Sequence, residues 1–190
     1  ADFEWAKSIA VGPGLSMNVA AAEITRCVLE RDDKVRILDA DALNIIAGEH
    51  IDYKGSREGQ IIITPHIMEM SRLTGKTVAD IKEHMIESAK EYAIQHSCIC
   101  ILKDARTVVT DGQKVYINCT GNDGMSTGGC GDVLTGLIAG MTAMGLDAFE
   151  AACLSVYVHG KAGDYAASGK GRAGMTAADI SEAIAYVLKR

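Results

Sequence analysis

The strongest feature of the sequence is TGNDGMSTGGCGDVLTGLIAG, residues 120–140. Five glycines lie in the twelve positions before Asp132, and a largely apolar run follows them. Glycine lets the backbone approach a ligand closely, and the free N–H groups in the first turn of a helix point back at the preceding loop. The stretch therefore predicts a loop that binds an anion, followed by a helix that begins near Asp132.

Asp132 is expected in the first turn of that helix, where the positive end of the helix dipole keeps a carboxylate ionised. Such a carboxylate, placed beside a bound phosphate, accepts a proton from a hydroxyl that attacks a phosphoryl group. We therefore expect Asp132 to act as a general base. A second interpretation stays open, in which the loop is merely flexible and Asp132 is an ordinary acidic residue at a helix N-terminus. The loop is not a Walker A motif, because no Gly-Lys-Ser/Thr follows it.

Outward from this stretch, short apolar runs alternate with segments of helical periodicity. The runs that predict parallel strands cover residues 8–11, 35–38, 60–64 and 98–102. Helices are predicted from residue 19, after Asp39, over 66–73, as one continuous helix over 77–93, and over 132–145, 148–167 and 177–188. Strands that alternate with helices form β-α-β units, so we predict an α/β fold with three layers and a mostly parallel central sheet.

The end of this sheet is the expected place for a site. A hairpin is predicted where Asp111-Gly112 separates two β-like runs at 107–110 and 115–118. In a parallel sheet, ligands bind where loops leave the carboxyl ends of the strands. The loop at residues 12–16, Asp39 and His66 fall at such ends. We therefore expect the site at this edge of the sheet.

The composition limits the function. The chain has 190 residues, of which 48% are apolar and 23% charged, and this fits one globular domain over residues 1–190. A net charge of -6 argues against a surface that follows DNA or RNA, so we expect no nucleic-acid polymer as a partner. The apolar runs fall well short of about 18 residues, so we expect no membrane partner and a cytoplasmic location.

Six cysteines are scattered along the chain. A chain of this size folds without cross-links, so we expect reduced thiols. No C-x-x-C pairs with a second ligand cluster, which gives a zinc site little support.

The long glycine-rich run carries a resemblance to a known family. GNDGMSTGGCGDVLTGLIAGM resembles the ADP/ATP-dependent NAD(P)H-hydrate dehydratases, a branch of the ribokinase-like superfamily. Shorter matches follow the same order as in that family: DADALN at 39–44, ITPHIMEMSRL at 63–73, LKDART at 102–107 and HGKAGD at 159–164. The resemblance implies a ribokinase-like fold over nearly the whole chain.

The resemblance also implies a function, the repair of hydrated NADH or NADPH (NADHX or NADPHX). Hydroxide is a poor leaving group, so ADP or ATP with Mg²⁺ would first phosphorylate the hydroxyl of the hydrated ring, and phosphate would then be eliminated. The enzyme would be a carbon-oxygen lyase. Two alternatives stay open: a small-molecule kinase of the same fold, acting on a vitamin precursor or a sugar alcohol, and a non-catalytic adenine-nucleotide-binding module.

Site residues follow from matching positions in the family, where Asp132 is the base that activates the hydroxyl. The residues implied to cradle the transferred phosphoryl group are Gly128, Gly129, Cys130 and Gly131. Those implied to bind the adenine nucleotide are Lys103, Asp104, Ala105, Arg106, Thr107 and Gly131. Those implied to contact the hydrate are Gly12, Gly14, His66, Asn122 and Asp132, and Glu69 is implied to order Mg²⁺ through water.

Three histidine and glutamate positions have competing interpretations. Vitamin kinases of this fold commonly have Asn where this chain has His66, which favours the dehydratase. His66 could instead merely cap a strand-to-helix turn, and Glu69 could be a solvated helix acid. We interpret His159 as a residue of helix packing near the loop rather than as a catalyst.

Several positions depart from the family pattern. Asp123 replaces a proline, Asp104 a glycine and Cys130 a threonine, while Ile67-Met68 replaces Pro-Gly. An acidic residue beside the loop weakens the binding of an anion, so we expect some drift of activity.

The family's domain is also considerably longer. We therefore expect early strands and part of the pocket to be absent before residue 1. A sheet edge that lacks its neighbours pairs readily with another chain, so we expect a homo-oligomer.

Overall fold

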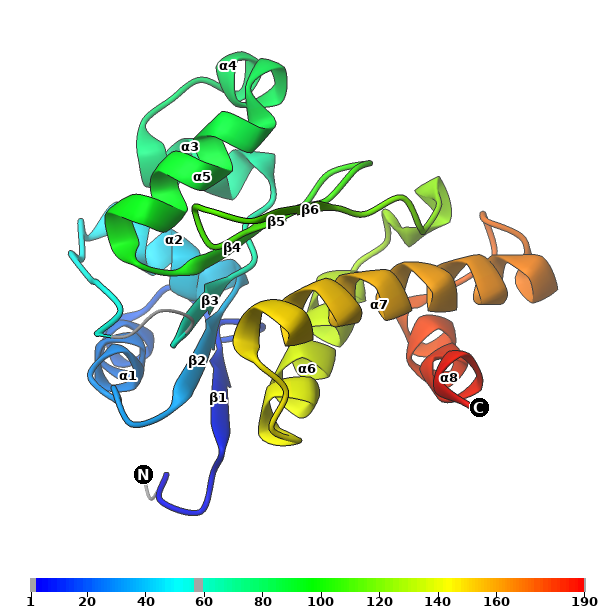
Figure 1. The fold of residues 1–190 in the computed structure, drawn as a ribbon, viewed down its shortest axis with the longest axis horizontal. Helices are drawn as coiled ribbons and strands as arrows, with labels where there is room; N and C mark the ends of the chain where they lie inside the picture. Colours follow the sequence, from blue (N-terminus) through cyan, green and yellow to red (C-terminus); the bar gives the residue numbers. More distant parts are fainter. Residues whose placement is uncertain (1–2, 57–59, 190) are drawn as a thin grey trace.

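The computed structural model describes residues 3–56 and 60–189. Its centre is a six-stranded sheet in the order β1-β2-β3-β4-β5-β6 (Figure 1). The strands are β1 (Ser8–Val11), β2 (Val35–Leu38), β3 (Ile61–Ile63), β4 (Ile99–Leu102), β5 (Val108–Thr110) and β6 (Val115–Ile117). The first four are parallel, and β5 and β6 form the predicted antiparallel hairpin. The prediction of an α/β fold with a mostly parallel sheet is confirmed.

Helices cover both faces of the sheet. One face carries α1 (Val19–Leu29), α2 (Ala40–Gly48), α3 (Ile67–Thr74) and α5 (Met85–His96), and the other carries α6 (Cys130–Ala143) and α7 (Ala148–Lys170) (Figure 1). Leu38 and Ile63 pack into the first core, whereas their neighbours Ile37 and Ile62 pack into the second. Both sides of these strands are apolar because helices cover both faces of the sheet. The last helix, α8 (Ala177–Leu188), packs against α7.

The prediction of one helix over 77–93 is wrong. The segment forms α4 (Val78–Glu83) and α5, which are separated at His84, where φ is -126° and ψ is 48°. Thr77 caps α4, with its hydroxyl oxygen accepting from the Asp80 amide at 3.2 Å. Ile81 of α4 and Ala89 of α5 both lie in the core at 0% exposure. No glycine or proline marks the break in the sequence.

The helix after the glycines begins earlier than predicted. Gly129 is the N-cap of α6 with a φ of 87°, a conformation that favours glycine, so Asp132 occupies the third helical position. Within the preceding loop, residues 123–125 form a short 3-10 turn, and the Asn122 side chain accepts from the Gly124 amide at 3.1 Å.

Two predictions about the whole chain can also be compared with the structure. All six cysteines are free, as predicted. Among the described residues, no helix combines the length and apolarity needed to cross a bilayer.

Candidate functional site

The carboxyl ends of the parallel strands meet at one edge, where the chain places its charged residues. The Asp39 amide, just after β2, donates to the carbonyl of Val11 at 3.1 Å. The Lys103 amide, just after β4, donates to the carbonyl of Pro65 at 2.8 Å. Hydrogen bonding between neighbouring strands thus continues past their ends and fixes the residues that follow them.

Asp39 is the most buried charged residue at this edge, with 1% of its surface exposed. Its Oδ1 lies 2.8 Å from Lys103 Nζ, and its Oδ2 accepts from the Thr135 hydroxyl of α6 at 2.7 Å. Gly12 packs directly on it: a Cβ on Gly12, whose φ is 126°, would lie 1.7 Å from the Asp39 carbonyl oxygen. Asp39 therefore connects the ends of β1, β2 and β4 to α6.

His66 and Glu69 form the cap of α3. His66 Nδ1 accepts from the Met68 and Glu69 amides at 3.1 and 3.2 Å, and Glu69 Oε2 accepts from the His66 amide at 2.8 Å. Glu69 is only 4% exposed, so the interpretation of it as a solvated acid is wrong. Burial raises the pKa of its carboxyl, against the opposing effects of the His66 amide and the Lys103 charge.

His66 does cap the strand-to-helix turn, as its second interpretation held. Its side chain is also 49% exposed and lines the cavity described next. Together, Asp39, His66, Glu69 and Lys103 make up what we term the strand-end cluster.

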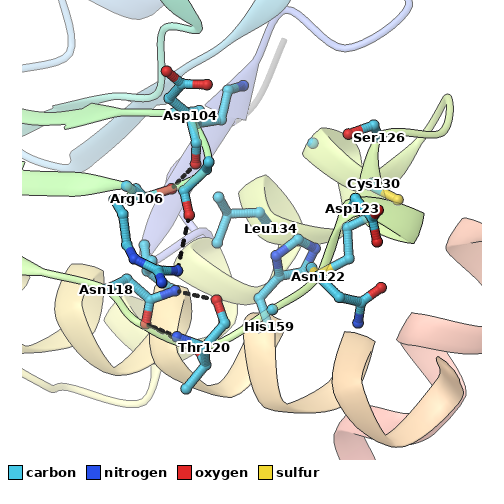
Figure 2. A pocket seen from close by; sticks show the side chains of 18 of the residues that line it. Asp104, Arg106, Asn118, Thr120, Asn122, Asp123, Ser126, Cys130, Leu134 and His159 are labelled. Carbon is cyan, nitrogen blue, oxygen red and sulfur yellow. Dashed lines mark hydrogen bonds between the residues drawn. The ribbon is translucent and has the colours of Figure 1, made fainter. Parts of the chain in front are cut away.

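A cavity of about 760 Å³ lies between the strand-end cluster and the glycine loop, which we define as residues 120–131. The segment 103–107 borders one side, and Asn122, Cys130 and Gly131 border the other. Figure 2 shows the side chains of Asp104 and Arg106 on one side and those of Asn122 and Cys130 on the other. The other lining residues include Asp123 and a group without charged side chains, which combines polar and apolar residues: Asn118, Thr120, Leu134, Val156 and His159. We term this group the uncharged end.

The first turn of α6 offers unpaired amides to this cavity. Cys130 donates its N–H to Thr127 at 3.4 Å, and Val133 donates to Gly129 at 3.1 Å. Across the described ranges, the structure gives no acceptor for the N–H groups of Gly131 and Asp132. A Cβ on Gly131 would lie 3.5 Å from Lys103 Nζ, so an ammonium group and free amides face the same space. Such an arrangement suits a phosphate.

His159 lies at the uncharged end and is 8% exposed. Its Nε2 has no hydrogen-bond partner among the described atoms, and Figure 2 shows its ring projecting from α7 into the space bordered by Leu134 and Cys130. Burial lowers its pKa to about 4, and the nearby Lys103 charge acts in the same direction. The imidazole is therefore neutral at physiological pH and offers a hydrogen bond without a charge.

The structure separates the predicted site residues into two groups. The residues that line the cavity are His66, Lys103, Asp104, Ala105, Arg106, Thr107, Asn122, Cys130 and Gly131. Those outside its lining are Gly12, Gly14, Glu69, Gly128, Gly129 and Asp132. Asp132 is exposed and follows directly after Gly131. Gly12 packs against the backbone of Asp39.

Sequence reasoning missed the connection of Asp39 to Lys103 and Thr135 and the place of His159 in the cavity. The motifs DADALN and HGKAGD contained two of these residues, but no spacing rule connects them to the loop. One departure from the family is partly compensated, because Arg172 Nη1 lies 3.1 Å from the Asp123 carboxylate.

The layers, the strand order and the site at the strand ends define a ribokinase-like α/β protein. A ribokinase-like superfamily protein from Enterococcus faecalis superimposes with a TM-score of 0.84 at 27% identity, over 95% of this chain and 62% of that one.

Within that class, the model of the NAD(P)H-hydrate dehydratase family matches residues 1–186, and the chain belongs to this family. The predicted resemblance is thereby confirmed.

Individual relatives agree with this assignment. The chain is 45% identical to the bifunctional NAD(P)H-hydrate repair enzyme of Moorella thermoacetica, over 95% of this chain and 34% of that protein. It is 35% identical to the ADP-dependent (S)-NAD(P)H-hydrate dehydratase of Neisseria meningitidis, over 95% and 62%. The Bacillus subtilis ADP/ATP-dependent NAD(P)H-hydrate dehydratase, co-crystallised with ATP/Mg²⁺, gives a TM-score of 0.87 at 32% identity, over 98% and 66%. The chain thus spans about a third of the bifunctional relatives.

Proposed function

We propose that this protein restores NADH or NADPH from the hydrated cofactor and consumes ADP or ATP in the process. The observation that carries the proposal is the meeting of Lys103 Nζ and the free first-turn amides of α6 at one cavity that His66 also borders. An ammonium group and oriented amides bind phosphate oxygens. Membership of the NAD(P)H-hydrate dehydratase family supports the choice of substrate.

The nucleotide fits the cavity in one direction. Its phosphates belong at Lys103 and Gly131, where the ammonium group and the free amides lie close together. Its base belongs at the uncharged end, whose apolar side chains and neutral polar groups suit a flat heterocycle. We place the hydrate near His66 and Asn122, with the loop at residues 12–14 behind them.

The chemistry then needs one base and one cradle. The hydrate hydroxyl attacks the terminal phosphoryl group of the nucleotide, the bond from phosphorus to the leaving oxygen breaks, and Asp132 takes the hydroxyl proton. The ring nitrogen lone pair then expels phosphate, and a proton leaves the neighbouring ring carbon to form the double bond. The cradle at residues 128–131 holds the migrating group with backbone amides.

The residues present fit a role for Mg²⁺. In the described chain, no group of three or more His, Cys, Asp or Glu gathers at one point to hold a metal. Mg²⁺ does not need one, because it binds through one or two carboxylates together with phosphates and waters. Glu69, buried beside Lys103, would contact it through water. Bound Mg²⁺ would offset the charge on the phosphate oxygens.

We also propose a homo-oligomer in the cytoplasm, with no nucleic-acid or membrane partner. Large apolar side chains, among them Trp5, Val19 and Met144, are exposed, and burying them between copies would be favourable. The net charge of -6 supports the absence of a polyanion partner. Sedimentation velocity across a concentration series tests the assembly, and a monomer at every concentration would refute it.

The dehydratase proposal is tested by absorbance at 340 nm. Hydrated NADH is mixed with the protein, Mg²⁺ and either ADP or ATP, and recovery of the NADH absorbance is expected only when a nucleotide is present. Asp132→Asn should abolish recovery. Asp80→Asn is the matched control, because Asp80 is also a carboxylate at the third position of its helix.

Two other results would replace the proposal. A stable phosphorylated product from a vitamin precursor or sugar alcohol, with no recovery of NADH, would identify a kinase. Binding of ADP or ATP that Asp132→Asn leaves unchanged, with no turnover of any substrate, would identify a nucleotide-binding module.

A further inference from the structure

The buried carboxylate of Asp39 has no role in the chemistry described so far. Both of its oxygens are occupied, one by Lys103 Nζ at 2.8 Å and the other by the Thr135 hydroxyl at 2.7 Å. The three residues come from distant parts of the chain, and the Asp39 and Thr135 side chains are almost fully buried. A charged residue in such surroundings is costly to bury, so its retention calls for an explanation.

Lys103 cannot fix its own position. Its side chain has four rotatable carbons and a strongly hydrated end, so an unpaired lysine at a cavity mouth turns toward water. Here the side chain is only 21% exposed, and its nitrogen lies against Gly131. One N–H of the ammonium group goes to Asp39, which leaves its other donors for a ligand in the cavity.

Thr135 connects the Asp39 carboxylate to the helix that carries the free amides. It lies one helical turn after Gly131 and Asp132, on the helix whose first turn carries the free N–H groups. Its hydroxyl holds the same carboxylate that holds Lys103. Through Asp39, the ammonium group and the start of α6 therefore keep a fixed separation.

We propose that Asp39 and Thr135 are positioning residues that hold Lys103 Nζ beside the first turn of α6, so that both act on the same phosphate group. The inference rests on the proposed function, and it assigns to Asp39 and Thr135 a part in nucleotide use. Asp39 is not a metal ligand in this account, because both of its oxygens already have partners.

The first test separates binding from alignment. Asp39→Asn leaves the Lys103 charge in place, so attraction for the nucleotide persists while alignment is lost. We expect kcat to fall about 30-fold and the nucleotide KM to change less than about threefold. Lys103→Met removes the charge, and there the KM should rise at least about tenfold. Equal changes in both parameters for the two variants would overturn the proposal, as would a raised Mg²⁺ requirement in Asp39→Asn, which indicates a metal ligand.

Substitutions of Thr135 are a milder test, because they leave the ion pair between Asp39 and Lys103 in place. Thr135→Val should lower kcat about fivefold, and Thr135→Ser, which retains the hydroxyl, should restore it. Thr142→Val is the matched control, since Thr142 is a buried threonine of the same helix whose hydroxyl donates only to α6 carbonyls at 2.9 and 3.0 Å. A loss of kcat in Thr142→Val as large as that in Thr135→Val would show a merely structural effect and overturn the proposal.

A second readout does not depend on turnover. Lysine acetylation, followed residue by residue with mass spectrometry, should modify Lys103 slowly in the folded protein and several times faster in Thr135→Val, with ADP protecting it in both. Unchanged Lys103 labelling in Thr135→Val and Asp39→Asn would refute the positioning role. Failure of the wild-type protein to restore NADH, with these labelling changes intact, would refute the dehydratase proposal alone.

Discussion

The two sides of the cavity are built differently. The strand-end cluster holds Asp39 and Glu69 at 1% and 4% exposure, Asp39 against Lys103 and Thr135 and Glu69 against the His66 amide. The glycine loop has four consecutive exposed residues at 126–129. Its start is held by Asp164, which accepts from the Gly121 amide at 3.1 Å and the Asn122 side chain at 3.0 Å.

This difference indicates that the two sides of the cavity have different roles. Fixed charges come from rigid strand ends, where their spacing cannot drift. The loop residues at 126–129, which precede the first turn of α6, are exposed and can adapt to a ligand. Substitutions on the first side should therefore affect folding as well as ligand use, whereas those on the second should affect ligand binding with little effect on folding.

The largest loss of stability is expected when a glycine beside the strand-end cluster is replaced, in comparison with a glycine of the loop. Gly12→Ala should cost at least about 4 kcal/mol of stability, because its Cβ would overlap the Asp39 carbonyl and its φ is unfavourable for alanine. Gly128→Ala meets open space in the loop and should change stability by less than about 1 kcal/mol. Urea unfolding measures both. Similar costs for the two variants would remove the contrast between the two sides.

Next in size is the removal of one partner from the buried ion pair. Lys103→Met leaves the Asp39 carboxylate buried with Thr135 as its remaining partner, and this should cost about 3 kcal/mol. Lys76→Met, which breaks an exposed pair with Glu91, should change stability little. Thermal and urea unfolding of both proteins provide the comparison. If the two variants lose the same stability, the strand-end cluster is not a rigid framework.

A third prediction concerns His159, which lies at the uncharged end of the cavity. Unfolded His159 takes up a proton near pH 6.5, whereas folded His159 does so only near pH 4, so stability falls as the pH drops through this window. The expected loss at pH 5 is about 2 kcal/mol relative to neutral pH.

His159→Gln should remove that loss, and His50→Gln, at an exposed position, should keep it. The raised pKa of Glu69 acts in the opposite direction in all three proteins, so the difference between them isolates His159. Equal acid sensitivity of wild type and His159→Gln, measured by urea unfolding at pH 7 and pH 5, would show that the buried imidazole does not resist protonation.

Much of the fold could be predicted because its signals are local. Apolar runs bounded by turns predicted β1 to β4, and Asp111-Gly112 predicted the hairpin. The break at His84 could not be predicted, because no glycine, proline or other turn residue marks it in the sequence.

The site was predictable to a lesser extent. Glycine spacing and the motif at 102–107 indicated residues that do line the cavity. The partnership of Asp39 with Lys103 and Thr135 joins positions 64 and 96 residues apart, and no periodicity encodes such a contact. The exposed position of Asp132 depends on where α6 begins, which is two residues before the predicted start.

Binding of phosphate between Lys103 Nζ and the first turn of α6 can be tested with Gly131→Ala. The added methyl would lie at ordinary contact distance from Lys103 Nζ and Asp39 Oδ2, so stability should stay within about 1 kcal/mol of wild type. It would fill the space that a phosphate needs. Gly136→Ala is the control on the same helix, with open space around it.

Calorimetric titration with ADP and Mg²⁺ decides the matter. The account predicts that Gly131→Ala weakens ADP binding at least about tenfold while Gly136→Ala binds as wild type does. ADP binding by a folded Gly131→Ala protein with wild-type affinity would contradict it.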